Sequence, residues 1–187
     1  MKKLALLFFA TLFSFSIQAQ TEDEARGLLD QYVDIFESKE WSRSLDLTYP
    51  DLFNVIPRDQ MEQVIESTFN SKLFEMSFGD LEVQNVSELY EEEGLSYRFM
   101  NYKQEMAMTV LDTEAVSISA LIGPMRAQFG EENVTVSGST LNILANNKLA
   151  VLKKSVDDKL YGLEIKNEHK GLMGNFMSET FVRRAVD

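Results

Sequence analysis

The sequence predicts an α+β fold in which N-terminal helices pack on a curved, mainly antiparallel sheet and a further helix closes the chain. Changes of hydrophobic period indicate this order. Apolar residues recur at helical spacing up to about residue 69, and from Phe74 onward they mostly alternate. Residues 172–186 return to helical spacing. No internal repeat or linker divides the sequence, so we expect one domain.

The first 19 residues have the parts of a secretory signal peptide. A basic start is followed by the apolar run Leu4–Phe15 and by Ala19 at the cleavage position. This run is too short to span a bilayer as a helix. We therefore expect removal of residues 1–19 and a single domain over residues 20–187.

Composition restricts the location and the partners. The chain has no cysteine, which a bacterial lipoprotein needs for its lipid, and no later apolar segment of membrane-spanning length. We expect a periplasmic or secreted protein with no integral membrane segment after cleavage. The net charge is −12, and loss of Lys2 and Lys3 lowers it to −14, which disfavours nucleic acid as a partner. No motif requires a cofactor, and we expect none.

Three helices are predicted before the sheet. Thr21 and Glu24 form a capping box for a helix over residues 22–38. A short second helix is expected from Trp41 and must end before Pro50. A third begins at Pro57. Its apolar positions are expected to be buried: Met61, Val64, Ile65, Thr68 and Phe69.

Leu95–Leu111 is predicted as one long strand, paired antiparallel with a strand that starts at Phe74. At roughly 3.3 Å per residue it would extend about 55 Å, so we expect a bend at Asn101–Glu105. The alternative is a helix over Tyr102–Val110, because Lys, Gln, Glu, Met and Ala favour helices. The even positions form a nearly continuous apolar face: Met100, Tyr102, Gln104, Met106, Met108 and Val110.

The remaining chain is predicted as a helix, four short strands and a closing helix. Asp112 or Thr113 should cap the first of these helices, and Gly130 should end it. Asn146 and Asn147 are expected to form a turn between the second and third strands. The strands are expected over residues 134–137, 140–144, 149–156 and 160–165, and the closing helix over 172–186.

This order of elements resembles the NTF2-like cone, a cystatin-like fold in which a curved sheet wraps a long first helix. The amino-acid sequence is also similar to small exported proteins of unknown function from Bacteroidetes, over nearly all of residues 21–165. The resemblance implies a pocket between the concave side of the sheet and the first helix. Residues used by enzymes similar to ketosteroid isomerase have no position-by-position match. The similar segments are a first helix ending near Trp41, Leu47-Thr48-Tyr49-Pro50, Met106-Ala107-Met108, and Phe129-Gly130 before Asn133-Val134.

Four residues are the candidate ligand-binding residues: Tyr32, Tyr102, Gln104 and Met106. Tyr32 lies on the buried stripe of the first helix, and the others lie on the even face of the long strand. Their polar groups would orient a small ligand in an apolar pocket. The alternative is that each tyrosine ring packs in the core and its hydroxyl binds backbone or water.

No residue set indicates metal binding or catalysis. His169 is the sole histidine and is expected on the surface, and a single histidine excludes the common multi-histidine zinc sites. A serine-histidine-aspartate triad could use only His169, and no Gly-x-Ser-x-Gly turn accompanies it. The acidic segments Glu91–Glu93 and Asp157-Asp158 lack calcium-loop spacing and are expected in turns.

Three functions follow as hypotheses. The first is an exported domain that binds a small apolar ligand or a protein partner without catalysis. The second is an isomerase, dehydratase or hydrolase-like enzyme that uses Tyr32, Tyr102 and a carboxylate. The third is a structural or interaction protein that forms a homodimer through its open sheet face.

Overall fold

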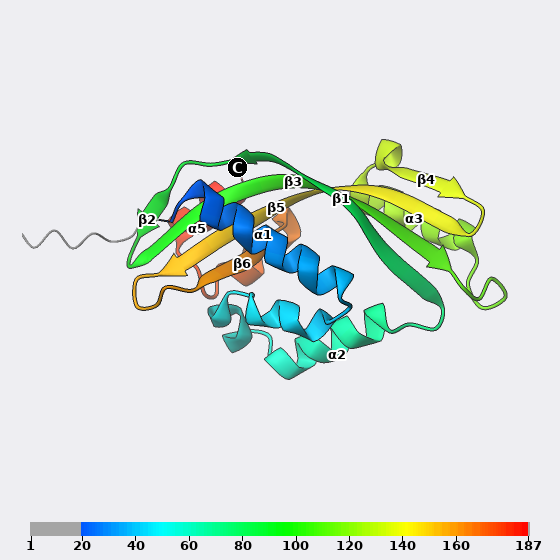
Figure 1. The fold of residues 1–187 in the computed structure, drawn as a ribbon, viewed down its shortest axis with the longest axis horizontal. Coiled ribbons are helices and arrows are strands. Elements are labelled where there is room, and N and C mark those ends of the chain that lie inside the picture. Colours follow the sequence, from blue (N-terminus) through cyan, green and yellow to red (C-terminus); the bar gives the residue numbers. More distant parts are fainter. Residues whose placement is uncertain (1–19, 187) are drawn as a thin grey trace, which may run out of the picture.

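The computed structural model describes residues 20–186, and the predicted signal peptide lies outside this range. The α+β prediction is confirmed: a curved, unclosed, six-stranded antiparallel sheet carries helices on both faces (Figure 1). The elements in order are α1 (Glu22–Glu37), η1 (Trp41–Asp46), η2 (Pro50–Asn54), α2 (Arg58–Phe69), β1 (Phe74–Val86), β2 (Tyr90–Glu92), β3 (Leu95–Val110), α3 (Ile118–Phe129), η3 (Glu131–Asn133), β4 (Val134–Ser137), β5 (Thr140–Lys154), β6 (Leu160–Ile165), η4 (Asn167–His169), α4 (Lys170–Met173) and α5 (Glu179–Val186).

Two long strands, β3 and β5, form the centre of the sheet. They pair antiparallel from Leu95 opposite Lys154 to Thr109 opposite Thr140. Strands β1 and β2 both pair with the other edge of β3, and β4 and β6 both pair with the other edge of β5. The sheet is therefore built around one long two-stranded ribbon, which Figure 1 shows running the length of the molecule.

The long strand ends within one residue of its predicted limit, and the helix alternative over Tyr102–Val110 is wrong. Its pairing with β5 shows no register shift. Instead, β1 carries two register shifts, between Phe78 and Leu81 and between Val83 and Asn85. Both lie opposite or beside the segment at which we expected a bend, so the irregularity is in the neighbouring strand.

Helices cover the two faces of β3 at different places. On the even face, α1 packs over Met100 and α3 packs over Met106 and Met108. On the odd face, α5 packs over Tyr97 and Phe99. The side chains of Tyr102 and Gln104 thus lie on the even face between the parts covered by α1 and by α3.

The N-terminal helices agree with the sequence in outline. The predicted capping box of α1 is present, with the Glu24 amide donating to Thr21 Oγ1 at 3.1 Å. The predicted second helix is a 3₁₀ helix, η1, and Pro57 precedes α2 as its N-cap. The five α2 positions that we expected to be buried are less enclosed than predicted: Val64 is 60% exposed, and the other four, Met61, Ile65, Thr68 and Phe69, are half-buried.

Three predictions in the C-terminal half are wrong. Asn146 and Asn147 do not form a turn, because β3 gives β5 an uninterrupted partner and places Tyr102 opposite Asn147. The closing helix is divided into α4 and α5, since the Ser178 hydroxyl accepts from the Phe181 amide at 3.0 Å and starts a new helix. Ser117, and not Asp112 or Thr113, precedes α3.

Candidate ligand-binding site

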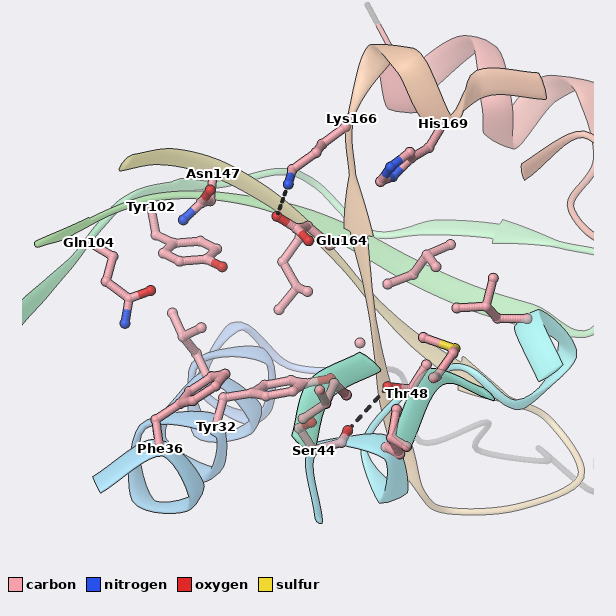
Figure 2. Close-up of a pocket in the computed structure, with 18 of the residues that line it drawn as sticks. Tyr32, Phe36, Ser44, Thr48, Tyr102, Gln104, Asn147, Glu164, Lys166 and His169 are labelled. Carbon is pink, nitrogen blue, oxygen red and sulfur yellow. Dashed lines mark hydrogen bonds and ion pairs between the residues drawn. The ribbon is translucent and has the colours of Figure 1, made fainter. Parts of the chain in front are cut away.

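A cavity of about 670 Å³ lies between the N-terminal helices and the even face of the sheet. All four residues that the sequence singled out line it: Tyr32, Tyr102, Gln104 and Met106. Figure 2 shows the Tyr32 side chain projecting from α1, with Tyr102 and Gln104 on the sheet opposite it. Small-molecule pockets have volumes of roughly 300–1,000 Å³, and this cavity falls within that range.

Aromatic side chains form one wall of the cavity. The rings of Phe36 and Phe78 have centroids 4.8 Å apart, and the rings of Trp41 and Phe69 are stacked at 4.4 Å. Phe36, Phe69 and Phe78 line the cavity directly. These rings come from α1, α2 and β1, so packing of the helices on the sheet assembles an apolar surface against which a ligand's hydrocarbon part can lie.

Tyr32 contributes a neutral hydroxyl. It is on the face of α1 that turns toward the sheet, one helical turn from Leu28 and Phe36. Burial raises the pKa of Tyr32 above its ordinary value, the negative charge of Glu164 adds to the rise, and a hydrogen bond with Thr48 opposes it. Tyr32 therefore stays protonated at neutral pH and serves as an uncharged polar group.

Tyr102 contributes a second neutral hydroxyl. Its direct cross-strand partner is Asn147 on β5. Burial raises the pKa of Tyr102, and the charge of Glu164 and the nearby Tyr32 raise it further, whereas a hydrogen bond with Asn147 lowers it. Tyr102 therefore also stays protonated at neutral pH and offers a second uncharged polar group.

Gln104 contributes an amide that makes no hydrogen bond within residues 20–186. The residue is 8% exposed, and its amide atoms are not among the fully buried atoms that lack a partner. Figure 2 shows the amide on the same side of the sheet as the Tyr102 ring, facing α1. The amide therefore keeps access to the cavity that it lines, where a polar atom of a bound molecule can pair with it.

Met106 contributes apolar surface between the cavity and α3. It lies directly opposite Phe78 on β1 and opposite Ile143 on β5. Met108, which shares its face, does not belong to the lining and packs in the cluster beneath α3. A flexible thioether at this position adapts readily to ligands of different outline.

Seven polar residues of the cavity were missed by sequence reasoning: Ser44, Thr48, Gln128, Asn147, Glu164, Lys166 and His169. Glu164 Oε1 and Lys166 Nζ form an ion pair at 3.1 Å. His169, which we expected on the surface, is half-buried and lines the cavity, because η4 follows β6 directly at the cavity edge (Figure 2). The sequence offered no signal for Asn147 or Glu164, because their places follow from the pairing of β5 with β3 and β6.

Comparison of the chain with known protein families, with curated proteins and with solved structures finds no match. Within residues 20–186, no group of three His, Asp or Glu side chains could hold a metal ion. No helix in that same range has both the length and the apolar character to cross a membrane. The chemistry of the cavity is therefore the main guide to function.

Proposed function

We propose that this chain is an exported NTF2-like domain that binds, without catalysis, an apolar small molecule with an uncharged polar end. The observation that carries the proposal is Gln104, whose amide lines a large apolar cavity and has no hydrogen-bond partner within residues 20–186. A polar ligand atom would satisfy it. The apolar part of the ligand would lie along Phe36, Phe69 and Phe78.

The polar groups around Gln104 favour an uncharged ligand end. An amide both donates and accepts, and the protonated hydroxyls of Tyr32 and Tyr102 do the same. The charges of Glu164 and Lys166 largely cancel through their ion pair. A charged ligand would lose its hydration without gaining a free counter-charge, whereas a hydroxyl, carbonyl or amide would be paired.

The burial of Gln104 also favours a small molecule over a protein partner. An interface side chain must reach the outer surface, and Gln104, which is 8% exposed, opens to the cavity instead. Dimerisation through the open sheet face stays a prediction, which light scattering tests by measuring whether the mass is near twice that of one chain.

Ligand capture with a matched pair of variants tests the proposal. Ile65 and Val64 are neighbours on α2, but Ile65 lines the cavity and Val64 is 60% exposed. Purified protein is incubated with a lipid and metabolite extract, and native mass spectrometry then detects retained molecules. We expect a retained apolar molecule with wild type and Val64→Trp, and loss with Ile65→Trp. Retention of nothing by wild type contradicts the proposal.

Export is supported by the basic start, apolar run and Ala19 at residues 1–19. Membership of the NTF2-like fold is supported by the curved sheet with α1 lying across one face. Cell fractionation of the full chain tests export: we expect the shortened protein in the periplasm or medium. Full-length protein in the cytoplasm would contradict it.

One observation favours a second candidate function, proton-transfer catalysis. Glu164 is a carboxylate of the cavity lining whose charge acts on both Tyr32 and Tyr102, so it is a candidate for the carboxylate of the enzymatic hypothesis. A carboxylate can take a proton from a substrate while tyrosine hydroxyls stabilise the negative charge that develops on its oxygen. The isomerase and dehydratase reactions of the enzymatic hypothesis need such a base and such stabilising hydroxyls.

The ligand itself distinguishes the two functions. The molecule captured by wild type is incubated with wild type and with Glu164→Gln, which keeps the shape and removes the charge. If the protein only binds, both leave the molecule unchanged and retain it equally. If the protein is an enzyme, wild type converts it and Glu164→Gln does not.

A further inference from the structure

Gln20 is enclosed at the point where the described chain begins. The residue is 1% exposed and precedes Thr21, the N-cap of α1. Its carbonyl accepts a hydrogen bond from Arg98 Nε at 3.2 Å, and Arg98 Nη1 also donates to the Ser87 carbonyl at 2.7 Å. Gln20 is therefore fixed against β3 and the segment before β2.

The side chain of Gln20 does not suit this position as a primary amide. Neither its Nε2 nor its Oε1 has a hydrogen-bond partner within residues 20–186, although both atoms are buried. Folded proteins retain few such groups, since each costs about 1–3 kcal/mol. A chemical change that removes polar hydrogens from this site would therefore stabilise the fold.

Gln20 would also be the first residue after cleavage at Ala19. A new α-amino group would then carry a positive charge next to the positive Arg98 and before the positive end of the α1 dipole. The first turn of α1 holds three carboxylates, of which Glu24 accepts from the Thr21 amide at 2.7 Å and Glu22 pairs with Arg26 at 2.7 Å. An uncharged N-terminus suits this site better than an ammonium.

We propose that Gln20 is the mature N-terminus and that it is converted to pyroglutamate. The inference rests on the export part of the proposed function and is independent of ligand binding. The α-amino nitrogen attacks the side-chain Cδ, a new C–N bond forms, and the Cδ–Nε2 bond breaks. The amide nitrogen leaves as ammonia and takes a proton from the amine. No oxidant, reductant or cofactor takes part.

The product is a five-membered lactam that carries no charge. It removes the ammonium beside Arg98 and replaces the two N–H donors of the primary amide by one lactam N–H. The backbone carbonyl of Gln20 is unchanged, so its hydrogen bond from Arg98 is retained. The lactam thus closes the N-terminal end of α1 with fewer unsatisfied polar hydrogens.

Intact mass and N-terminal sequencing of the exported protein test the proposal. The full chain is produced with its leader in a Gram-negative host, isolated from the periplasm and incubated until its mass no longer changes. We expect the mass of residues 20–187 less one ammonia, and a wild-type N-terminus that resists amine-dependent sequencing. The matched control is Gln20→Asn, which is one methylene shorter and would have to close a four-membered ring. Its N-terminus should stay readable.

The outcomes separate the two proposals. A wild-type chain that begins at Gln20 with a free amine overturns the lactam and leaves export standing. A retained leader, or a start at another residue, overturns the lactam and the predicted cleavage together. Ligand capture by the same samples reports on the cavity independently of both results.

Discussion

The hydroxyl oxygen of Tyr32 lies 2.8 Å from the position that a Cβ atom on residue 162 would occupy, and Cε2 of the same ring lies 3.0 Å from it. Residue 162 is glycine, so α1 approaches β6 more closely than any other residue would allow. The same glycine also holds the segment between η1 and η2, since its amide donates to the Leu47 carbonyl at 2.6 Å and its carbonyl accepts from the Tyr49 amide at 3.0 Å. One glycine thus sets the position of Tyr32 in the cavity.

Gly162→Ala should therefore destabilise the protein. The added methyl group forces the Tyr32 ring to move, and overpacking of this kind typically reduces the free energy of unfolding by about 1–3 kcal/mol. Urea denaturation measures the change. The control is Gly27→Ala in α1, where a Cβ meets nothing within 4 Å. It should stabilise the protein by about 0.5–1 kcal/mol, because alanine favours helix over glycine. Equal effects of the two substitutions would contradict the close contact.

Tyr97→Phe should loosen α5. The Tyr97 hydroxyl accepts from Arg184 Nη1 at 2.9 Å, and Tyr97 is fully buried beneath the helix. Loss of this charge-assisted bond should lower the free energy of unfolding by about 1–2 kcal/mol. Amide hydrogen exchange in α5 should also accelerate. The matched control is Tyr90→Phe, whose hydroxyl makes no hydrogen bond within residues 20–186. A similar loss in both variants would show that ring packing, and not the bond, holds α5.

The parts of the fold that the sequence predicted well are those in which local pattern and tertiary contact agree. The capping box of Thr21 and Glu24 and the alternation along β3 both act over a few residues. The Asn146-Asn147 pair shows the opposite case, because two residues that favour turns locally lie within a strand. Pairing with β3 along the whole of β5 outweighs that preference, and no local signal reveals the partner.

The residues of the candidate site likewise include some that the sequence could predict and some that it could not. Tyr32, Tyr102 and Gln104 could be predicted because helix and strand periodicity fix the face on which each lies. Glu164 and Asn147 could not, since their places depend on the register of β5 with β3 and β6. His169 depends on a turn after β6 that brings η4 to the cavity edge, and sequence alone indicated only a loop.

The buried tyrosines should make the protein less stable in alkali. The pKa values of Tyr32 and Tyr102 are raised in the folded protein, first by burial. Above about pH 10 the unfolded chain loses tyrosine protons that the folded chain retains, so the free energy of unfolding falls as pH rises. Tyr32→Phe removes one of these groups, and its stability should fall less steeply with pH. Urea unfolding at a series of alkaline pH values measures both slopes, and equal slopes would contradict the assignment.

Gln104→Leu should separate stability from binding. Leucine has nearly the same size, and it removes an amide that has no hydrogen-bond partner within residues 20–186, so the free protein should keep its stability. The ligand loses its polar partner, and its affinity should fall about 10-fold or more, since a buried polar group of the ligand is then left unpaired. Titration calorimetry with the captured ligand measures the affinity, and urea denaturation measures the stability.

Glu105→Leu is the matched control for this change. Glu105 is the next residue of β3 and is exposed on the opposite face of the sheet. Its replacement should leave ligand affinity unchanged. Unchanged affinity in Gln104→Leu would show that the amide does not contact the ligand. A large loss of stability would instead show that Gln104 has a partner in the free protein, and either result would remove the observation on which the binding proposal rests.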